Sequence, residues 1–177
     1  GTQAIETILM QFPSNGPATV IVQHMPAGFT KSFAERLNTL CQVEVREAID
    51  GDSVIPGRVL IAPGNFHMLV KRSGARYFVN VKEGPLVNRH RPSVDVLFQS
   101  AAETLGPNAV GLMLTGMGND GAASMVKMKE AGAQNFAQDE TSSVVYGMPR
   151  AAYEAGAVHH VVGINDIAKR VIAATCS

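Results

Sequence analysis

Short runs of β-branched residues alternate with segments of helical periodicity along the whole chain, and this alternation restricts the fold more than any other feature. It predicts a doubly wound α/β fold, with a mostly parallel sheet and helices on both faces. The predicted parallel strands cover residues 19–23, 43–47, 58–62, 109–115, 134–138 and 157–162. The predicted helices cover residues 29–39, 93–105, 121–131, 149–155 and 165–175, after a first helix that Thr2 would cap. One antiparallel hairpin is expected from residues 67–71 and 76–82.

Size and composition favour one domain over residues 1–177. Hydrophobic residues make up 46% of the chain and charged residues 17%, which excludes a disordered protein. A net charge of zero argues against a nucleic-acid binder or an anionic-membrane binder. The two cysteines have no metal-binding spacing, and no apolar run approaches the ~18 residues of a membrane span. We therefore expect a cytoplasmic protein with no metal and no membrane insertion.

The chain opens with a predicted helix that soon leads into the strand 19–23, whose composition suits burial on both faces. In a doubly wound sheet, such a helix is normally the return from a preceding strand. The sheet is therefore expected to lack its first strand, which would come before Gly1. The alternative, that the fold simply begins with a helix, is equally consistent with the pattern.

Ligands of open parallel sheets bind beyond the carboxyl ends of the strands, so polar residues there are candidates for chemistry. His24 directly follows the strand 19–23, where a neutral imidazole suits a general base. The alternative is a hydrogen-bonded loop histidine. His67, His159 and His160 lie within predicted strands and are interpreted as structural.

The glycines at 116, 118 and 121 lie between a strand and a helix, and Asp139 follows about 20 residues later, which matches the coarse pattern of a dinucleotide-binding fingerprint. However, Asp120 stands where a pyrophosphate would need a positive site. An aspartate at a helix start stays ionised, which suits orienting a histidine. The alternatives are a plain N-cap for Asp120 and turn geometry for the glycines.

A small basic cluster, Arg89-His90-Arg91, leads into the helix that starts near Ser93. Arg89 and Arg91 are candidates for receiving an acidic substrate or partner, with a solvated loop as the alternative. No serine lies in a tight strand-to-helix turn. Ser93 is the only candidate nucleophile within the chain, and it is also a candidate substrate-binding residue.

Four segments of the chain resemble the catalytic domain of the bacterial chemotaxis protein-glutamate methylesterase family. They are Val22-Gln23-His24-Met25-Pro26, residues 89–95 (Arg-His-Arg-Pro-Ser-Val-Asp), residues 114–121 (Leu-Thr-Gly-Met-Gly-Asn-Asp-Gly), and residues 137–140 together with 146–150. The segments come in the family's order and span most of the chain. The third is the most specific.

The resemblance implies a serine hydrolase that needs no cofactor and removes methyl groups from glutamate γ-methyl esters on the cytoplasmic helices of chemoreceptors. Many members also deamidate receptor glutamines. His24 would be the general base, Asp120 its orienting partner, and the Met117 backbone N–H part of the oxyanion hole. Gly1 and Thr2 match the end of the family's Ala-Ser-x-Gly-Gly-Thr turn, which places the nucleophilic serine three residues before Gly1.

The family's full-length protein also carries an N-terminal receiver domain, and the resemblance implies that the parent of this chain is a response regulator with an esterase effector domain. Two other functions stay open at this point. One is a dinucleotide-binding module built on the three glycines. The other is an inactive receptor-binding scaffold, if no serine precedes the chain.

Overall fold

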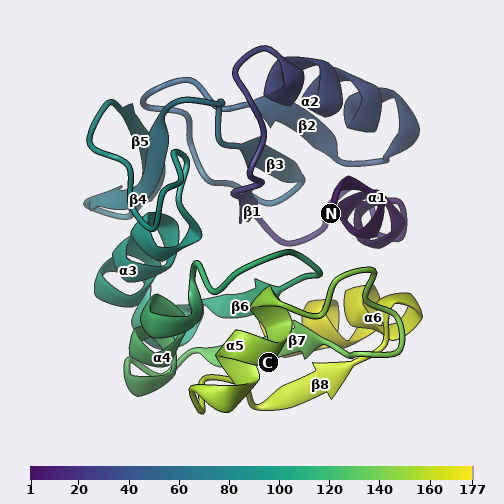
Figure 1. The fold of residues 1–177 in the computed structure, drawn as a ribbon. Helices are drawn as coiled ribbons and strands as arrows, with labels where there is room; N and C mark the ends of the chain where they lie inside the picture. Colours follow the sequence, from purple (N-terminus) through teal and green to yellow (C-terminus); the bar gives the residue numbers. More distant parts are fainter. Residues whose placement is uncertain (177) are drawn as a thin grey trace.

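The computed structural model describes residues 1–176 and has the doubly wound α/β architecture expected from the alternation (Figure 1). Its parallel strands are divided between two three-stranded sheets. The first has the order β1 (Thr19–Ile21), β3 (Arg58–Ile61), β2 (Glu44–Glu47), and the second has the order β6 (Val110–Met113), β7 (Gln134–Gln138), β8 (His160–Val162). The predicted hairpin is present as β4 (His67–Ser73) and β5 (Arg76–Lys82).

Helices lie on both sides of these sheets. They are α1 (Thr2–Leu9), α2 (Phe29–Leu40), α3 (Val94–Thr104), α4 (Ala122–Glu130), α5 (Met148–Glu154) and α6 (Ile164–Thr175), with a short 3-10 turn at Gly106–Asn108. In Figure 1, α1, α2 and α6 lie on one side, whereas α3 and α4 lie on the other. Each helix buries one apolar stripe, because its apolar residues recur about every 3.6 positions.

The core follows from the burial of these stripes against the strands. On one side, Leu37 of α2 and Ile167 of α6 are fully buried in a cluster that also includes Val59 and Ile61 of β3. On the other side, Leu60 of β3 belongs to a separate buried cluster with the apolar residues of the hairpin. β3 is therefore buried on both faces, as its continuous apolar sequence predicts.

Two element boundaries differ from the sequence-based expectations. Thr2 lies inside α1, and Gly1 takes the N-cap position without a side-chain hydrogen bond, so the predicted Thr2 cap is wrong. The last strand begins at His160 and not at residue 157, because the Ala157 N–H still donates to the Ala152 carbonyl at the end of α5.

The strand expected over 19–23 is also different. β1 ends at Ile21, and all of its residues are only partly buried. β1 pairs with β3 alone and β6 pairs with β7 alone, so the other edge of each strand is unpaired. A cavity of about 540 Å³ lies between these two edges. Among the described residues, the second edge of β1 therefore has no neighbouring strand.

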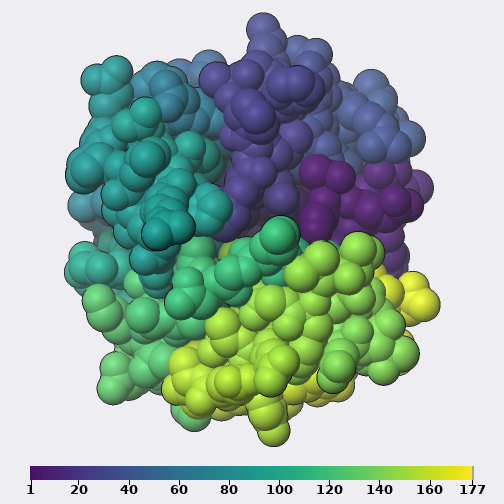
Figure 2. All heavy atoms as spheres, viewed as in Figure 1, coloured from purple at the N-terminus to yellow at the C-terminus, as the bar shows by residue number. Residues whose placement is uncertain are grey.

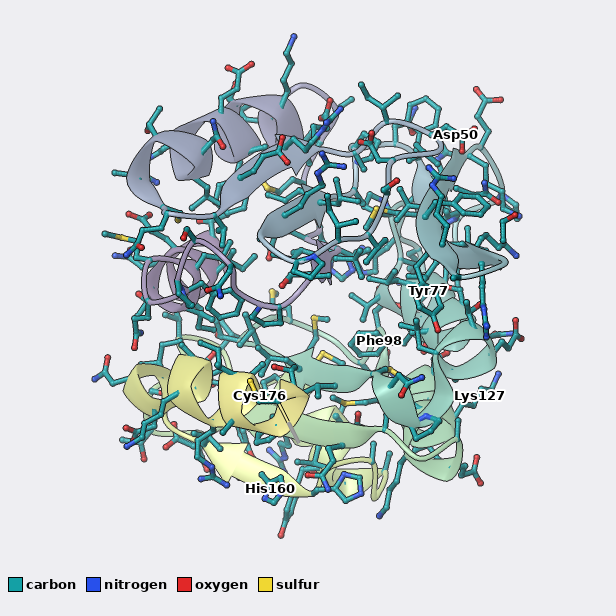
Figure 3. All side chains as sticks on the ribbon, turned by 180° about the vertical axis from the view of Figure 1, so that it is seen from behind. Asp50, Tyr77, Phe98, Lys127, His160 and Cys176 are labelled. Carbon is teal, nitrogen blue, oxygen red and sulfur yellow. The ribbon has the colours of Figure 1, made fainter. Side chains whose placement is uncertain are left out.

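Apolar side chains from both halves of the molecule line this cavity, which we call the central cavity. Examples are Ile5, Val20, Phe98, Leu112 and Val171. Figure 3 shows Phe98 of α3 at the level where the two halves meet. Within residues 1–176, no helix is long and apolar enough to cross a lipid bilayer.

Candidate active site

The loops that follow β1 and β6 bring His24 and Asp120 together. His24 Nε2 lies 2.7 Å from Asp120 Oδ2, although 96 positions separate the two residues in the sequence. The predicted hydrogen-bond contact between them is thus confirmed. In Figure 2, the segments coloured for residues near 25, 90 and 115 meet on one face of the molecule. His24 keeps 21% of its side chain exposed, whereas Asp120 is almost completely buried, at 1%.

Asp120 is a buried carboxylate that is fully satisfied by hydrogen bonds. Besides His24, its donors are Asn88 Nδ2 (2.8 Å), Ser93 Oγ (2.7 Å), the Val94 N–H (2.7 Å) and the Asp95 N–H (3.2 Å). Burial alone would raise the pKa of this carboxyl, but the hydrogen bonds outweigh burial and hold the pKa well below its ordinary value. Asp120 is therefore ionised at any physiological pH.

The ionised carboxylate determines which tautomer His24 adopts. A carboxylate only accepts hydrogen bonds, so the proton must be on His24 Nε2. Nδ1 then carries the lone pair of the neutral ring. The arrangement can take a proton at Nδ1 and stabilise the resulting imidazolium through Asp120, as general-base catalysis requires.

His90 covers one face of the His24 ring. The two imidazoles are stacked, with ring centroids 3.6 Å apart and planes inclined by only 4°. Burial and the neighbouring His24 lower the pKa of His90, although Asp120 opposes this shift. His90 therefore favours the neutral form and can pack against His24 without charge repulsion. The sequence indicated only a basic cluster at this point, because no spacing rule identifies a stacking partner.

The loop 88–93 is held in an unusual backbone conformation that presents these groups. Asn88 and Arg89 have positive φ angles of 52° and 67°. The N–H and carbonyl groups of Val87 and His90 exchange two hydrogen bonds across this turn. Asparagine is one of the few residue types that tolerate positive φ, but this signal was too weak to identify Asn88 as a partner of Asp120.

The structure distinguishes the three residues of this loop that were predicted to bind substrate. Arg89 is exposed and forms no ion pair or hydrogen bond within residues 1–176. Arg91 donates to the Gly84 carbonyl (2.7 Å) and to Asn65 Oδ1 (3.1 Å), so it also stabilises the loop. Ser93 is fully buried with its hydroxyl on Asp120, so it supports the carboxylate and does not face a partner.

The glycine-rich segment after β6 serves packing and turn geometry. A Cβ on Gly121 would lie 2.5 Å from Val94 Cγ1 and 2.7 Å from Met113 Cε, and the residue has a φ of 98°. Asp120 is turned inward onto the first residues of α3. Its carboxylate also adds negative charge where a dinucleotide would place its phosphates, which disfavours the dinucleotide-binding alternative.

The other histidines are structural, as expected. His67 is buried and contacts the Pro85 carbonyl at 2.7 Å, and His159 Nδ1 accepts the Asn135 N–H at 2.9 Å. His160 lies at the outer edge of the molecule (Figure 3). Within residues 1–176, no group of three or more histidine, cysteine or acidic side chains is arranged to hold a metal ion.

A model of the CheB methylesterase family matches residues 1–171. The chain belongs to this family. The resemblance inferred from the four sequence segments is therefore confirmed.

Relatives with curated names support the same assignment. The chain is 58% identical over 172 residues to a protein-glutamate methylesterase/protein-glutamine glutaminase from Rhizobium johnstonii, covering 97% of this chain and 47% of the relative. It is 56% identical over 174 residues to a protein of the same name from Rhodospirillum rubrum, covering 98% and 48%. The chain thus spans about half the length of the curated relatives it matches.

The fold is also shared with a solved structure. The crystal structure of the Thermotoga maritima CheB methylesterase catalytic domain superposes with a TM-score of 0.95 at 38% identity, covering 98% of this chain and 92% of that chain.

Proposed function

We propose that this chain is the catalytic domain of a cytoplasmic protein-glutamate methylesterase that hydrolyses glutamate γ-methyl esters on chemoreceptors and so resets their methylation. The observation that carries the proposal is the 2.7 Å contact between His24 and the buried, ionised Asp120. This pair is the base-and-orienter unit of a serine hydrolase. The names of the curated relatives support a methyl ester of a protein glutamate as substrate, and also deamidation of protein glutamines. The chemoreceptor as the protein substrate rests on the family resemblance.

The nucleophile of this mechanism is the serine expected three residues before Gly1, in the turn that ends a strand lying in the central cavity. His24 follows β1 and Asp120 follows β6, so a parallel strand between β1 and β6 would end beside both residues. The cavity is lined mainly by apolar side chains, which suits a buried strand. The Gly1 nitrogen lies 3.1 Å from the Thr115 carbonyl oxygen, in the loop that follows β6.

The chemistry follows from the protonation states. As the serine oxygen attacks the ester carbonyl carbon, its proton moves to His24 Nδ1. The tetrahedral intermediate collapses, the bond to the methoxy group breaks, and this group leaves as methanol with the proton from His24. Water then loses a proton to His24 as its oxygen attacks the acyl-enzyme. The bond to the serine oxygen breaks, this oxygen takes the proton back from His24, and the glutamic acid product loses its proton to solvent. With a glutamine substrate, ammonia leaves in place of methanol.

The surface around His24 suits a protein substrate. Leu86 and His24 border the same surface pocket, and Leu86 and Met117 are 59% and 73% exposed. Arg89 adds a positive charge that has no ion-pair partner within residues 1–176. Apolar contacts next to a free cation fit a receptor helix that carries acidic residues around the esterified glutamate. We assign Arg89, and in part Arg91, to this docking.

The deciding experiment uses the full-length protein, with whatever precedes Gly1, and measures methanol release from methylated receptor. His24→Ala should reduce kcat/KM by about 10³-fold or more, since the serine then keeps its proton. His160→Ala, a histidine at the outer edge of β8, is the matched control and should keep full activity. A full-length protein that releases no methanol would overturn the proposal and favour an inactive receptor-binding scaffold. A His24→Ala variant with normal turnover would instead mean that another group is the base.

The parent protein is also proposed to carry a receiver domain that regulates the esterase. The chain spans 47% to 48% of its first two curated relatives, which leaves room for a further domain in those proteins. Limited proteolysis and phosphorylation of the full-length protein test this directly. An esterase rate that does not respond to an aspartyl-phosphorylating reagent would contradict it.

A further inference from the structure

We propose that the segment Val145–Met148 positions the Met117 N–H as an oxyanion donor, and that Gly147 is the positioning residue that makes this possible. The inference rests on the proposed esterase function and gives a role to residues 145–148, to which the family resemblance assigned none. It follows from how one peptide group, the one between Gly116 and Met117, is held.

The carbonyl end of this peptide group is fixed by the backbone of the neighbouring segment. Gly116 O accepts hydrogen bonds from the Gly147 N–H at 3.2 Å and the Met148 N–H at 2.8 Å. In a trans peptide, the carbonyl and the following N–H point in opposite directions. The Met117 N–H must therefore point away from Val145–Met148.

The Met117 N–H is free to bind a ligand. Within residues 1–176 it donates to no backbone or side-chain acceptor. Met117 borders the central cavity together with His24 and Thr115. A donor that is oriented before substrate arrives stabilises a developing oxyanion without paying for reorganisation. The Gly116–Met117 peptide thus offers a free N–H in a fixed orientation, as an oxyanion hole requires.

Gly147 is required at its position by space and not by backbone conformation. Its φ is −94°, which any residue adopts. However, a Cβ at Gly147 would lie 2.6 Å from Gly116 O, 3.1 Å from Gly118 N and 3.3 Å from Met117 Cα. All three atoms belong to the backbone, so only a displacement of the loop would relieve the contact. A side chain at 147 would therefore move the Gly116–Met117 peptide.

Further hydrogen bonds, from Val145 and from Gln138, hold the loop just before this peptide. The Thr115 hydroxyl donates to the Val145 carbonyl and accepts the Val145 N–H, each at 2.9 Å. The Gly116 N–H donates to the same carbonyl at 3.0 Å. Buried Gln138 accepts the Thr115 N–H at 2.9 Å. The backbone that leads into the Gly116–Met117 peptide is thus also fixed, which further limits rotation of this peptide group.

The test is Gly147→Ala in the full-length protein, assayed with a small methyl ester. Loss of one oxyanion donor costs about 10²- to 10³-fold in kcat, so partial misplacement should lower kcat by at least about tenfold. KM should change less than about threefold, because the donor acts mainly in the transition state. The affinity of a boronate that mimics the tetrahedral intermediate should fall in parallel with kcat.

Two controls separate positioning from general damage. Gly57→Ala is a control for destabilisation, because its Cβ would lie 2.8 Å from the backbone oxygen of Ser14 and its φ of 81° adds strain, far along the chain from the site. It should lower the melting temperature and leave kcat per folded molecule unchanged. Thr115→Ser keeps the hydroxyl that bonds Val145 and should keep kcat. Thr115→Val removes this hydroxyl and should lower kcat.

The outcomes distinguish this inference from the proposed function. An active wild type together with an unchanged kcat in Gly147→Ala would overturn the positioning role and leave the esterase intact. If the wild type has no esterase activity, a crystal structure of Gly147→Ala still tests the positioning role. The Gly116–Met117 peptide should be displaced in it, and an unmoved peptide would refute the role of Gly147.

Discussion

The imidazole rings of His24 and His90 lie face to face, 3.6 Å apart and 4° from parallel. This stack and the hydrogen bond to Asp120 together limit the rotation of His24. His24 Nδ1 is thereby aimed before any substrate binds, which lowers the entropic cost of reaching the reactive geometry.

Removing the stacked ring should reduce turnover. We expect His90→Ala to lower kcat about tenfold, because His24 gains rotational freedom, and His90→Phe to recover most of the loss by keeping a flat ring. The assay is kcat on a small methyl ester with the full-length protein. Equal losses in the two variants would mean that His90 acts through its nitrogens and not through its face.

Asp120→Asn should separate charge from shape. The amide is nearly isosteric but brings its own N–H groups toward the donors that now surround the carboxylate. We expect a destabilisation of about 1–3 kcal/mol and a loss of kcat of about 10³- to 10⁴-fold. Denaturant unfolding and ester hydrolysis measure the two effects, with exposed Asp166→Asn as the control. Normal kcat in Asp120→Asn would contradict its orienting role.

Acid should destabilise the fold in two pH windows. Burial and the neighbouring His24 lower the pKa of His90, so below about 6.5 the unfolded chain binds more protons and stability decreases. Asp120 has a lowered pKa, so its contribution is present above about 3.8 and is lost as the pH falls further. His90→Phe should reduce the loss of stability below about pH 6.5, although His159, whose pKa is also lowered, contributes to the same loss. Asp120→Asn should remove most of the loss of stability below about pH 3.8. Denaturant unfolding curves measured at a series of pH values will show both changes.

Arg89 and Arg91 should behave differently when neutralised. Arg89→Asn removes a free charge while allowing positive φ, so turnover on receptor should fall a few-fold and lose salt dependence, with small-ester hydrolysis unchanged. Arg91→Ala also loses bonds to Gly84 and Asn65, so both substrates and the melting temperature should be affected. Equal losses on both substrates in Arg89→Asn would rule out docking by Arg89.

Filling the central cavity should stabilise the protein strongly. We expect residues 1–177 alone to unfold with low cooperativity. When its natural upstream segment precedes the same chain, the free energy of unfolding should rise by several kcal/mol, at about 25 cal/mol per Å² of apolar surface buried. A Gly/Ser extension of equal length is the control. If both extensions leave the melting temperature unchanged, the cavity does not receive a strand.

Local patterns in the sequence determined the order of strands and helices and the loops that carry chemistry. Alternating β-branched runs and helical periodicity identified β3 and α6, and the loop positions of His24 and Asp120 followed from strand ends. These features need only neighbouring residues, because burial of an apolar stripe is expressed in spacing along the chain.

Only the tertiary structure decided the contacts among separate loops. The His90 stack, the Asn88 bond to Asp120 and the close approach of Gly147 to Gly116 join segments whose spacing follows no rule. The pairing of β1 with β3 alone and of β6 with β7 alone was likewise hidden, because a strand's sequence records that it is buried but not which neighbour buries it. Sequence patterns specify local conformation, whereas the site depends on long-range packing that brings these loops within hydrogen-bond distance.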